Sequence, residues 1–206
     1  MPNYCGNILS VRGAADELRR FREENSFKGS PKKADIRRGN IMDVCDEAER
    51  AAKPLSFEMH LPTPKEFAGK PSPPPEHRSV ENELTKLLAG EIPPYDWYTW
   101  RLKNWGTKWD LRPDIKVMED YEDGLLQYDF DTAWSPPCAW LVSVSAKYPD
   151  LTFHLQYEES GCDFEGYIKI VNGEAVEEKE GSYTRCYLCG RRGCGCTPEQ
   201  KRGQEE

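Results

Sequence analysis

Four cysteines near the C-terminus have a spacing that could hold a metal ion. They follow the pattern Cys186-x2-Cys189-x4-Cys194-x-Cys196. Four thiolates can close a tetrahedral zinc site with no open position, at Zn–S distances of about 2.3 Å. Gly190 permits the tight turn that a C-x-x-C-G sequence needs around a metal. The sequence therefore predicts a structural zinc ion bound by Cys186, Cys189, Cys194 and Cys196.

Other residues bear on this zinc site. The side chains of Arg185, Arg191 and Arg192 would offset the negative charge of a tetrathiolate. One-residue spacing between the last two cysteines is seldom used, so Cys162 or His154 could replace one ligand. The alternative is a flexible tail with reduced thiols. Clustered, exposed thiols are reactive, and this favours the metal site.

Two aspartates could perform acid–base or metal chemistry. Asp129 and Asp131 lie two residues apart in a strand-like segment, so their carboxylates share one face. A solvated sheet face explains the same pattern and is favoured. His60, His77 and His154 have no partner at a catalytic spacing, and no phosphate-loop, zinc-protease or serine-hydrolase motif is present. We therefore expect no enzymatic activity and keep a hydrolase using Asp129 and Asp131 as an alternative.

Four of the six tryptophans lie between residues 95 and 110, in the sequence YDWYTWRLKNWGTKWD. Trp105 and Trp109 are expected in the core, where large aromatic side chains bury much area. For Trp97 and Trp100, a core position and a surface position are equally expected. If they are exposed, then with Arg101 they are binding candidates, because tryptophan and arginine dominate binding hot spots.

Acidic residues cluster in the segment from residue 158 to 180. A solvated hairpin is the ordinary explanation and is favoured, while an acidic surface that imitates nucleic acid or attracts a basic host protein by long-range electrostatics is the sharper one. Its binding candidates are Glu158, Glu159, Asp163, Glu165, Glu177 and Glu178. Basic residues that could instead contact a phosphate backbone are Lys28, Lys32, Lys33, Arg37, Arg38, Arg191 and Arg192.

The overall charge limits the classes of partner. The chain has 206 residues, a net charge of −8 and a pI near 5.1. Such a chain is repelled by nucleic acid and anionic membranes at long range. No apolar run is long enough to cross a membrane, and the start MPNYCGNILSV lacks the features of a signal peptide. We therefore expect a cytoplasmic protein whose cysteines are thiols or metal ligands.

Periodicity in the first half predicts the elements that position these residues. Strands are expected at residues 7–11 and 55–61, and helices at 14–25, 41–52, 80–89 and 95–105. Gly106 would end the last of these helices in a left-handed conformation. The many prolines of residues 62–75 predict an exposed loop.

The second half predicts strands at 125–131 and 151–157, with a helix at 137–148 that starts at Ser135-Pro136. A hairpin of residues 164–171 and 175–178 turns at Asn172-Gly173. This order predicts an α+β sandwich with helices on one face of a mostly antiparallel sheet. We expect one domain at 1–180, with a basic insertion at 27–52 and the proline-rich loop at 62–75, followed by a cysteine-rich tail at 181–206.

Three segments together resemble the YubB-like family. These are MPNYCGNILSVRG, WYTWRLKNWGTKWD and DFDTAWSPP, and the resemblance extends in patches from Met1 to about Val171. Tyr4 stands where the family usually has tryptophan. The resemblance implies a ferredoxin-like fold and a gene carried on phages, plasmids or other mobile elements. It implies no catalytic residue and no substrate.

These observations favour a non-enzymatic accessory protein that binds a host protein. By analogy with other mobile-element genes, that host protein could belong to an antiviral defence system, which would make the chain anti-CRISPR-like. The first alternative is an RNA or single-stranded nucleic-acid binder, and the second is a metal-dependent hydrolase.

Overall fold

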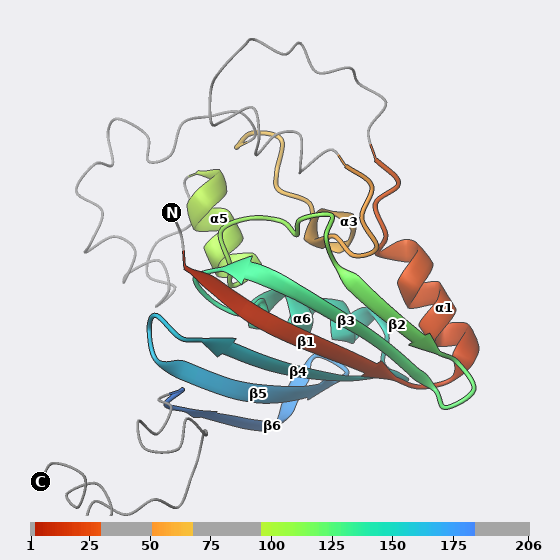
Figure 1. The fold of residues 1–206 in the computed structure, drawn as a ribbon. Helices are drawn as coiled ribbons and strands as arrows, with labels where there is room; N and C mark the ends of the chain where they lie inside the picture. Colours follow the sequence, from red (N-terminus) through yellow and green to blue (C-terminus); the bar gives the residue numbers. More distant parts are fainter. Residues whose placement is uncertain (1–2, 30–50, 68–95, 184–206) are drawn as a thin grey trace, which may run out of the picture.

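A computed structural model describes residues 3–29, 51–67 and 96–183 (Figure 1). The described part of the chain contains both strands and helices. The elements are β1 (Tyr4–Arg12), α1 (Ala15–Glu24), α3 (Phe57–His60), α5 (Trp97–Asn104), β2 (Lys116–Asp120), β3 (Leu125–Ala133), α6 (Cys138–Lys147), β4 (Thr152–Glu159), β5 (Phe164–Val171) and β6 (Glu174–Gly181).

The strands form one six-stranded sheet in the order β2-β3-β1-β4-β5-β6. Every neighbouring pair is antiparallel. The order β2-β3-β1-β4, with α1 after β1 and α6 after β3, is the β-α-β-β-α-β arrangement of the ferredoxin-like fold. The hairpin partner β6 extends that sheet by one strand beyond β5. The predicted α+β class is confirmed.

The hydrophobic core lies between the helices and one face of the sheet. Figure 1 shows α1, α3, α5 and α6 on the same side of the sheet. The ring of Phe21 in α1 meets Tyr128 of β3 and Phe153 of β4 edge-on, with ring centroids 6.3 and 5.4 Å apart. Strand side chains that face this core are Leu9, Val11, Leu126, Tyr128, Phe130, Phe153, Leu155, Ile168 and Ile170.

The basic insertion predicted at 27–52 leaves and re-enters the fold at neighbouring points. Phe27 and Lys53 form an isolated antiparallel bridge, with both backbone N–H groups donating to the opposite carbonyl at 2.8–2.9 Å. Most of the insertion, and the helix predicted at 80–89, lie outside the described residues. Residues 62–67, the described part of the proline-rich loop, contain a turn and neither helix nor strand.

Three sequence expectations need correction. Residues 55–61 form no strand, because α3 occupies Phe57–His60. Strand β2 was not predicted. Helix α6 begins at Cys138, and the Ser135 hydroxyl does not cap it but donates to the carbonyl of Gly106. Gly106 itself has the predicted left-handed backbone, with φ of 87°.

Within the described residues, no helix has both the length and the apolar composition needed to span a membrane.

Candidate functional site

One face of the sheet is left uncovered by the helices that the structure describes (Figure 1). Strand side chains alternate between the two faces, so the residues opposite the core set belong to this open face. The register aligns one row of them across all six strands. In sheet order this row is Lys116, Asp129, Ile8, Gln156, Tyr167 and Lys179.

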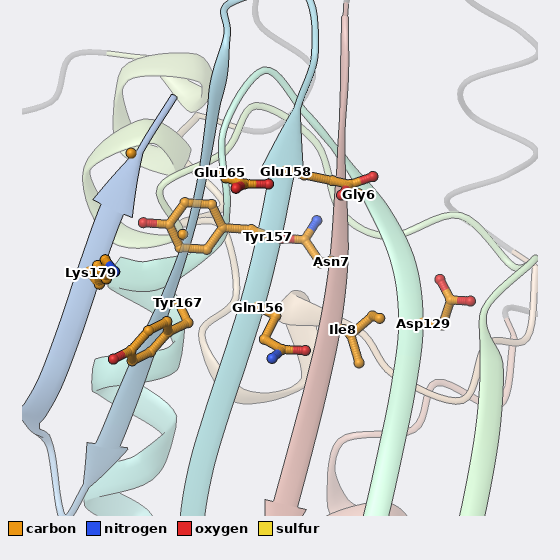
Figure 2. A pocket seen from close by; sticks show the side chains of 12 residues that line it. Gly6, Asn7, Ile8, Asp129, Gln156, Tyr157, Glu158, Glu165, Tyr167 and Lys179 are labelled. Atoms are coloured by element: carbon orange, nitrogen blue, oxygen red, sulfur yellow. The ribbon is translucent and has the colours of Figure 1, made fainter. Parts of the chain in front are cut away.

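A shallow hollow of about 610 Å³ lies on the open face. Figure 2 shows Ile8, Gln156 and Tyr167 along it, with Glu158 and Glu165 at one end. Gly6 and Gly181 also line the hollow, and because neither has a side chain, the surface is recessed at their end of the sheet. The hollow therefore presents apolar and aromatic groups beside carboxylates.

The open face carries more acidic than basic side chains. The carboxylates are Asp120, Asp129, Asp131, Glu158, Glu165, Glu174 and Glu177, and the cations are Arg12, Lys116, Lys169 and Lys179. Asp129 forms an ion pair with Lys116, with 2.9 Å between Asp129 Oδ2 and Lys116 Nζ. Burial, together with repulsion from Asp114 and Asp129, raises the pKa of Asp131. The face is thus biased toward negative charge.

Large apolar side chains are exposed on or beside this face. Tyr4 (44% exposed), Ile8 (39%) and Met118 (49%) belong to it by strand alternation. Trp134, which is 45% exposed, follows the last residue of β3. Sequence reasoning did not select any of these four as binding candidates.

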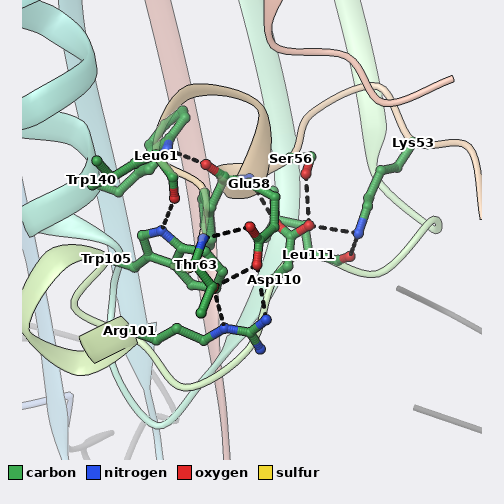
Figure 3. Close-up of polar contacts among 11 residues, drawn as sticks. Lys53, Ser56, Glu58, Leu61, Thr63, Arg101, Trp105, Asp110, Leu111 and Trp140 are labelled. Atoms are coloured by element: carbon green, nitrogen blue, oxygen red, sulfur yellow. Dashed lines mark hydrogen bonds and ion pairs between the residues drawn. The ribbon is translucent and has the colours of Figure 1, made fainter. Parts of the chain in front are cut away.

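The predicted binding residue Arg101 is buried in the structure. It is 9% exposed, and its guanidinium forms an ion pair with Glu58 at 2.9 Å and donates to Thr63 Oγ1 at 3.0 Å (Figure 3). The same guanidinium lies over the rings of Trp105 and Trp97, 4.6 and 5.3 Å from their centroids. These contacts join α5 to α3 and to the segment that follows α3, so the observed role of Arg101 is structural.

The tryptophans of this segment divide unevenly between core and surface. Trp105 is fully buried, as expected, and its indole N–H donates to the Leu61 carbonyl at 2.9 Å. Trp100 packs edge-on against Trp105, with centroids 6.0 Å apart, and is half-buried. Trp97 is also half-buried. Trp109 was expected in the core but is half-buried, with the Lys108 ammonium 4.8 Å from its ring centroid.

A buried ion pair fixes the end of the tryptophan-rich segment (Figure 3). Lys53 Nζ lies 2.7 Å from Asp110 Oδ2, and the two side chains are 0% and 3% exposed. Asp110 also accepts hydrogen bonds from the Ser56 hydroxyl and the Phe57 backbone N–H, both at 2.7 Å. Lys53 also donates to the Leu111 carbonyl at 2.9 Å. This network fastens the start of α3 to the strand-connecting segment after α5.

The predicted acidic candidates occupy three different places. Glu158, Glu165 and Glu177 lie on the open face, while Glu178 lies on the opposite face of β6. Asp163 is in the β4–β5 turn and accepts a hydrogen bond from the Ser182 hydroxyl at 2.7 Å.

Glu159 does not belong to the acidic surface. It is 3% exposed, and its carboxylate accepts hydrogen bonds from the backbone N–H groups of Gly161, at 2.9 Å, and Cys162. Burial alone would raise the pKa of Glu159, but the hydrogen bonds from Cys162 and Gly161 hold it below its usual value. Its carboxylate stabilises the turn after β4.

Several predicted site residues lie outside the described residues. These are the zinc ligands Cys186, Cys189, Cys194 and Cys196 and the basic residues Lys32, Lys33, Arg37, Arg38, Arg191 and Arg192. Lys28 is described and exposed. Asp129 and Asp131 share one face as predicted, and no group of three or more metal-ligating side chains occurs within the described ranges.

Three comparisons relate this chain to known proteins. Residues 105–189 match the family model described as a ferredoxin-like domain in Api92-like protein. The uncharacterized protein YubB of Escherichia coli (strain K12) is 30% identical over 91 residues, which cover 44% of this chain and 60% of YubB. A crystal structure of a protein api92 from Yersinia pseudotuberculosis aligns with a TM-score of 0.47 and 11% identity, over 89% of this chain and 99% of that one.

The aligned part spans less than two thirds of YubB. The family match and this relative support a likeness to YubB-like and Api92-like proteins, and the family match agrees with the observed ferredoxin-like sheet order. None of the three descriptions names an activity.

Proposed function

We propose that this chain is a non-catalytic accessory protein that binds a basic partner protein through the open face of its sheet. The observation that carries the proposal is the set of exposed apolar side chains set among carboxylates on a face free of described helices. Large apolar side chains exposed among charged groups are a feature of protein interaction surfaces. Carboxylates around them steer a partner of opposite charge and exclude partners of like charge.

The nucleic-acid alternative is less well supported by this face. Some ferredoxin-like sheets stack single-stranded bases on exposed aromatics, and Tyr4 and Tyr167 could do so here. However, Asp129, Asp131 and Glu158 lie among those rings, where a phosphate backbone would have to pass. The net charge of −8 adds long-range repulsion. A polycation-bearing protein fits these charges better than a polyanion.

The biological setting is part of the proposal and rests on the resemblance to the YubB-like family. In that setting the partner is a host protein of a bacterium, and the acidic face suits a component of an antiviral defence system because such components commonly carry basic nucleic-acid-binding surfaces. Occupying that basic surface would block its nucleic acid.

Charge reversal on the open face tests the proposed function. Asp129→Lys with Asp131→Lys should abolish affinity capture of a protein from bacterial lysate, and nuclease treatment of the lysate should leave wild-type capture unchanged. The matched control is Asp16→Lys with Glu23→Lys, which places the same charges on exposed positions of α1. Equal capture by both double variants, or capture that disappears with nuclease, would overturn the proposal.

The hydrolase alternative has a separate test on the same carboxylates. If either carboxylate took part in catalysis, Asp129→Asn or Asp131→Asn would remove the biological effect while leaving partner capture intact. For a binder, the effect and the capture should decline together.

A further inference from the structure

Trp134 has an unusual backbone conformation for a bulky residue. Its φ is 72°, in the left-handed region that residues with a Cβ atom seldom adopt. Its side chain is nevertheless 45% exposed, and no described residue accepts a hydrogen bond from its indole N–H. A strained residue that is not buried gains little from packing, so its conformation needs another explanation.

Hydrogen bonds on both sides hold the Trp134 turn in place. The Trp134 backbone N–H donates to the Asn3 carbonyl at 3.1 Å. Thr107 Oγ1 donates to the Ala133 carbonyl at 2.9 Å. Thr132 Oγ1 donates to the Ser135 carbonyl at 2.8 Å. The residues before, at and after Trp134 are therefore each fixed.

The tryptophan-rich segment supplies part of this support. Besides the Thr107 bond, the Gly106 carbonyl accepts a hydrogen bond from the Ser135 hydroxyl. A Cβ atom at Gly106 would lie 2.9 Å from the Pro136 carbonyl oxygen, so only glycine allows this approach. The sequence NWGT, in which Trp105 and Thr107 are buried, thus supports the turn that carries the exposed Trp134.

Tyr4 and several charges surround this end of the open face. Tyr4 pairs with Ala133 in the sheet, one residue before Trp134, and Figure 1 shows the start of β1 beside the end of β3. Arg112 donates to the Tyr4 hydroxyl at 3.4 Å. Asp129 and Asp131 line a small hollow of about 220 Å³ with Asp114, Arg112 and Lys116.

We infer that Trp134, with Tyr4 beside it, anchors the partner protein, and that the partner offers an apolar pocket rimmed by lysine or arginine side chains. This inference rests on the proposed function. Tryptophan and tyrosine are the side chains that most often dominate binding energy when they enter a pocket. Asp131 lies three residues before Trp134, on the open face at the same end of β3, so a basic rim is the complementary one.

The electrostatics near Asp131 agree with a basic partner. The pKa of Asp131 is raised by burial and by the nearby carboxylates of Asp114 and Asp129. A cation from a partner would relieve this repulsion. A second copy of the chain would add like charge, since each copy carries −8.

The experiment uses peptides as a defined probe for the partner. A displayed library of random twelve-residue peptides is selected on the full chain, and affinities of synthesised peptides are measured by fluorescence anisotropy. We expect the selected peptides to carry net positive charge and to lose at least about thirtyfold in affinity to Trp134→Gly, the range of a hot-spot residue. Met59→Ala alters an equally exposed apolar residue within α3 (44%) and should change affinity less than twofold.

Stability separates a binding role from a structural one. Glycine adopts positive φ without strain, so Trp134→Gly should denature at the same or a higher urea concentration than wild type. Trp134→Asn, which also tolerates this conformation, serves as the second variant. Unchanged affinity in both variants would overturn the inference, whether or not the urea midpoint falls.

The two proposals fail differently. If Asp129→Lys with Asp131→Lys abolishes peptide binding but Trp134→Gly does not, the open face binds and Trp134 is not its anchor. If no basic peptide is selected, or the selected peptides ignore both variants, the proposed function itself fails. Concentration-dependent dimerisation that Trp134→Gly removes would make the occupant a second copy and overturn the basic-partner inference.

Discussion

Replacing Asp110 with asparagine should destabilise the protein severely. Asp110→Asn keeps the size of the side chain and removes its charge, which leaves the Lys53 ammonium in a site that is 0% exposed. Asparagine also offers one acceptor oxygen where Asp110 uses two, which accept from Lys53, Ser56 and Phe57. Removing one partner of a buried ion pair costs about 3–5 kcal/mol. That is a large part of the roughly 5–15 kcal/mol that stabilises a typical domain.

Urea denaturation at pH 7 measures this cost, as the change in midpoint multiplied by the slope. Asp129→Asn is the matched control, because Lys116 and Asp129 also pair at 2.9 Å but are 82% and 47% exposed. Exposed pairs contribute about 0–1 kcal/mol, so this control should hardly move the midpoint.

A double variant tests the reasoning more strictly than the size of the loss. Lys53→Met combined with Asp110→Asn removes the stranded ammonium together with its partner, so the double variant should be more stable than Asp110→Asn alone. If Asp110→Asn costs less than about 1 kcal/mol, or if the double variant loses the sum of the two single losses, the buried charge is not the source of the instability.

The remaining predictions concern protons and metal. Burial, and then the charge of Lys147, lowers the pKa of His60, so its stabilising contribution is complete above the unfolded pKa of about 6.5 and is lost as pH falls through the folded pKa. The urea midpoint of wild type should therefore fall more between pH 7.5 and 5 than that of His60→Gln, and parallel curves would contradict this. Burial raises the pKa of Cys5 to about 12 and of Cys138 to about 11, so peptide mass spectrometry after iodoacetamide should find both unmodified in the native chain. Native mass spectrometry should detect one zinc ion per chain, and a metal-free chain with Cys186, Cys189, Cys194 and Cys196 all alkylated would refute the zinc site.

Much of the sheet could be predicted because its signals are local. Alternation in residues 7–11, 125–131 and 151–157 marked β1, β3 and β4, and Asn172-Gly173 marked the β5–β6 turn. The sequence pattern did not predict β2, because this five-residue edge strand is exposed along most of its length and shows no clear alternation of apolar and polar residues.

The error at residues 55–61 has a tertiary cause. Leu55 and Phe57 are both buried, as a strand pattern requires, yet the backbone turns into helix α3. Asp110 binds the Phe57 N–H from a position more than fifty residues away. That N–H lies in the first turn of the helix, where no intrahelical carbonyl is available to accept it. The pattern of residues 55–61 alone cannot indicate that Asp110 accepts this hydrogen bond.

The candidate site was less predictable than the fold. Composition predicted Trp97, Trp100 and Arg101 as binding residues. Arg101 instead pairs with Glu58 and lies over two indole rings, so it is part of the packing. The exposed Trp134 sits at a positive φ whose turn is held by two other segments, at Asn3 and at Gly106–Thr107, and no sequence periodicity indicates such long-range contacts. Only the parity of β1, with Cys5 and its alternate neighbours buried, could have indicated that Tyr4 and Ile8 face outward.

The tryptophan-rich segment NWGTKWD and the turn at Trp134 are physically linked, because the first supports the second. The segment NWGTKWD is held in place by the hydrogen bond of the Trp105 indole and by the ion pair of the buried Asp110 carboxylate. Thr107 and Gly106 of this segment in turn form hydrogen bonds that support the turn at Trp134. Rigid support lowers the conformational entropy that an anchor side chain loses on binding. Loosening the support should therefore weaken binding without any change to the surface. Thr107→Val, which removes only the hydroxyl that holds Ala133, should reduce peptide affinity while Trp134 stays in place; equal affinity would show that the support is irrelevant to the anchor.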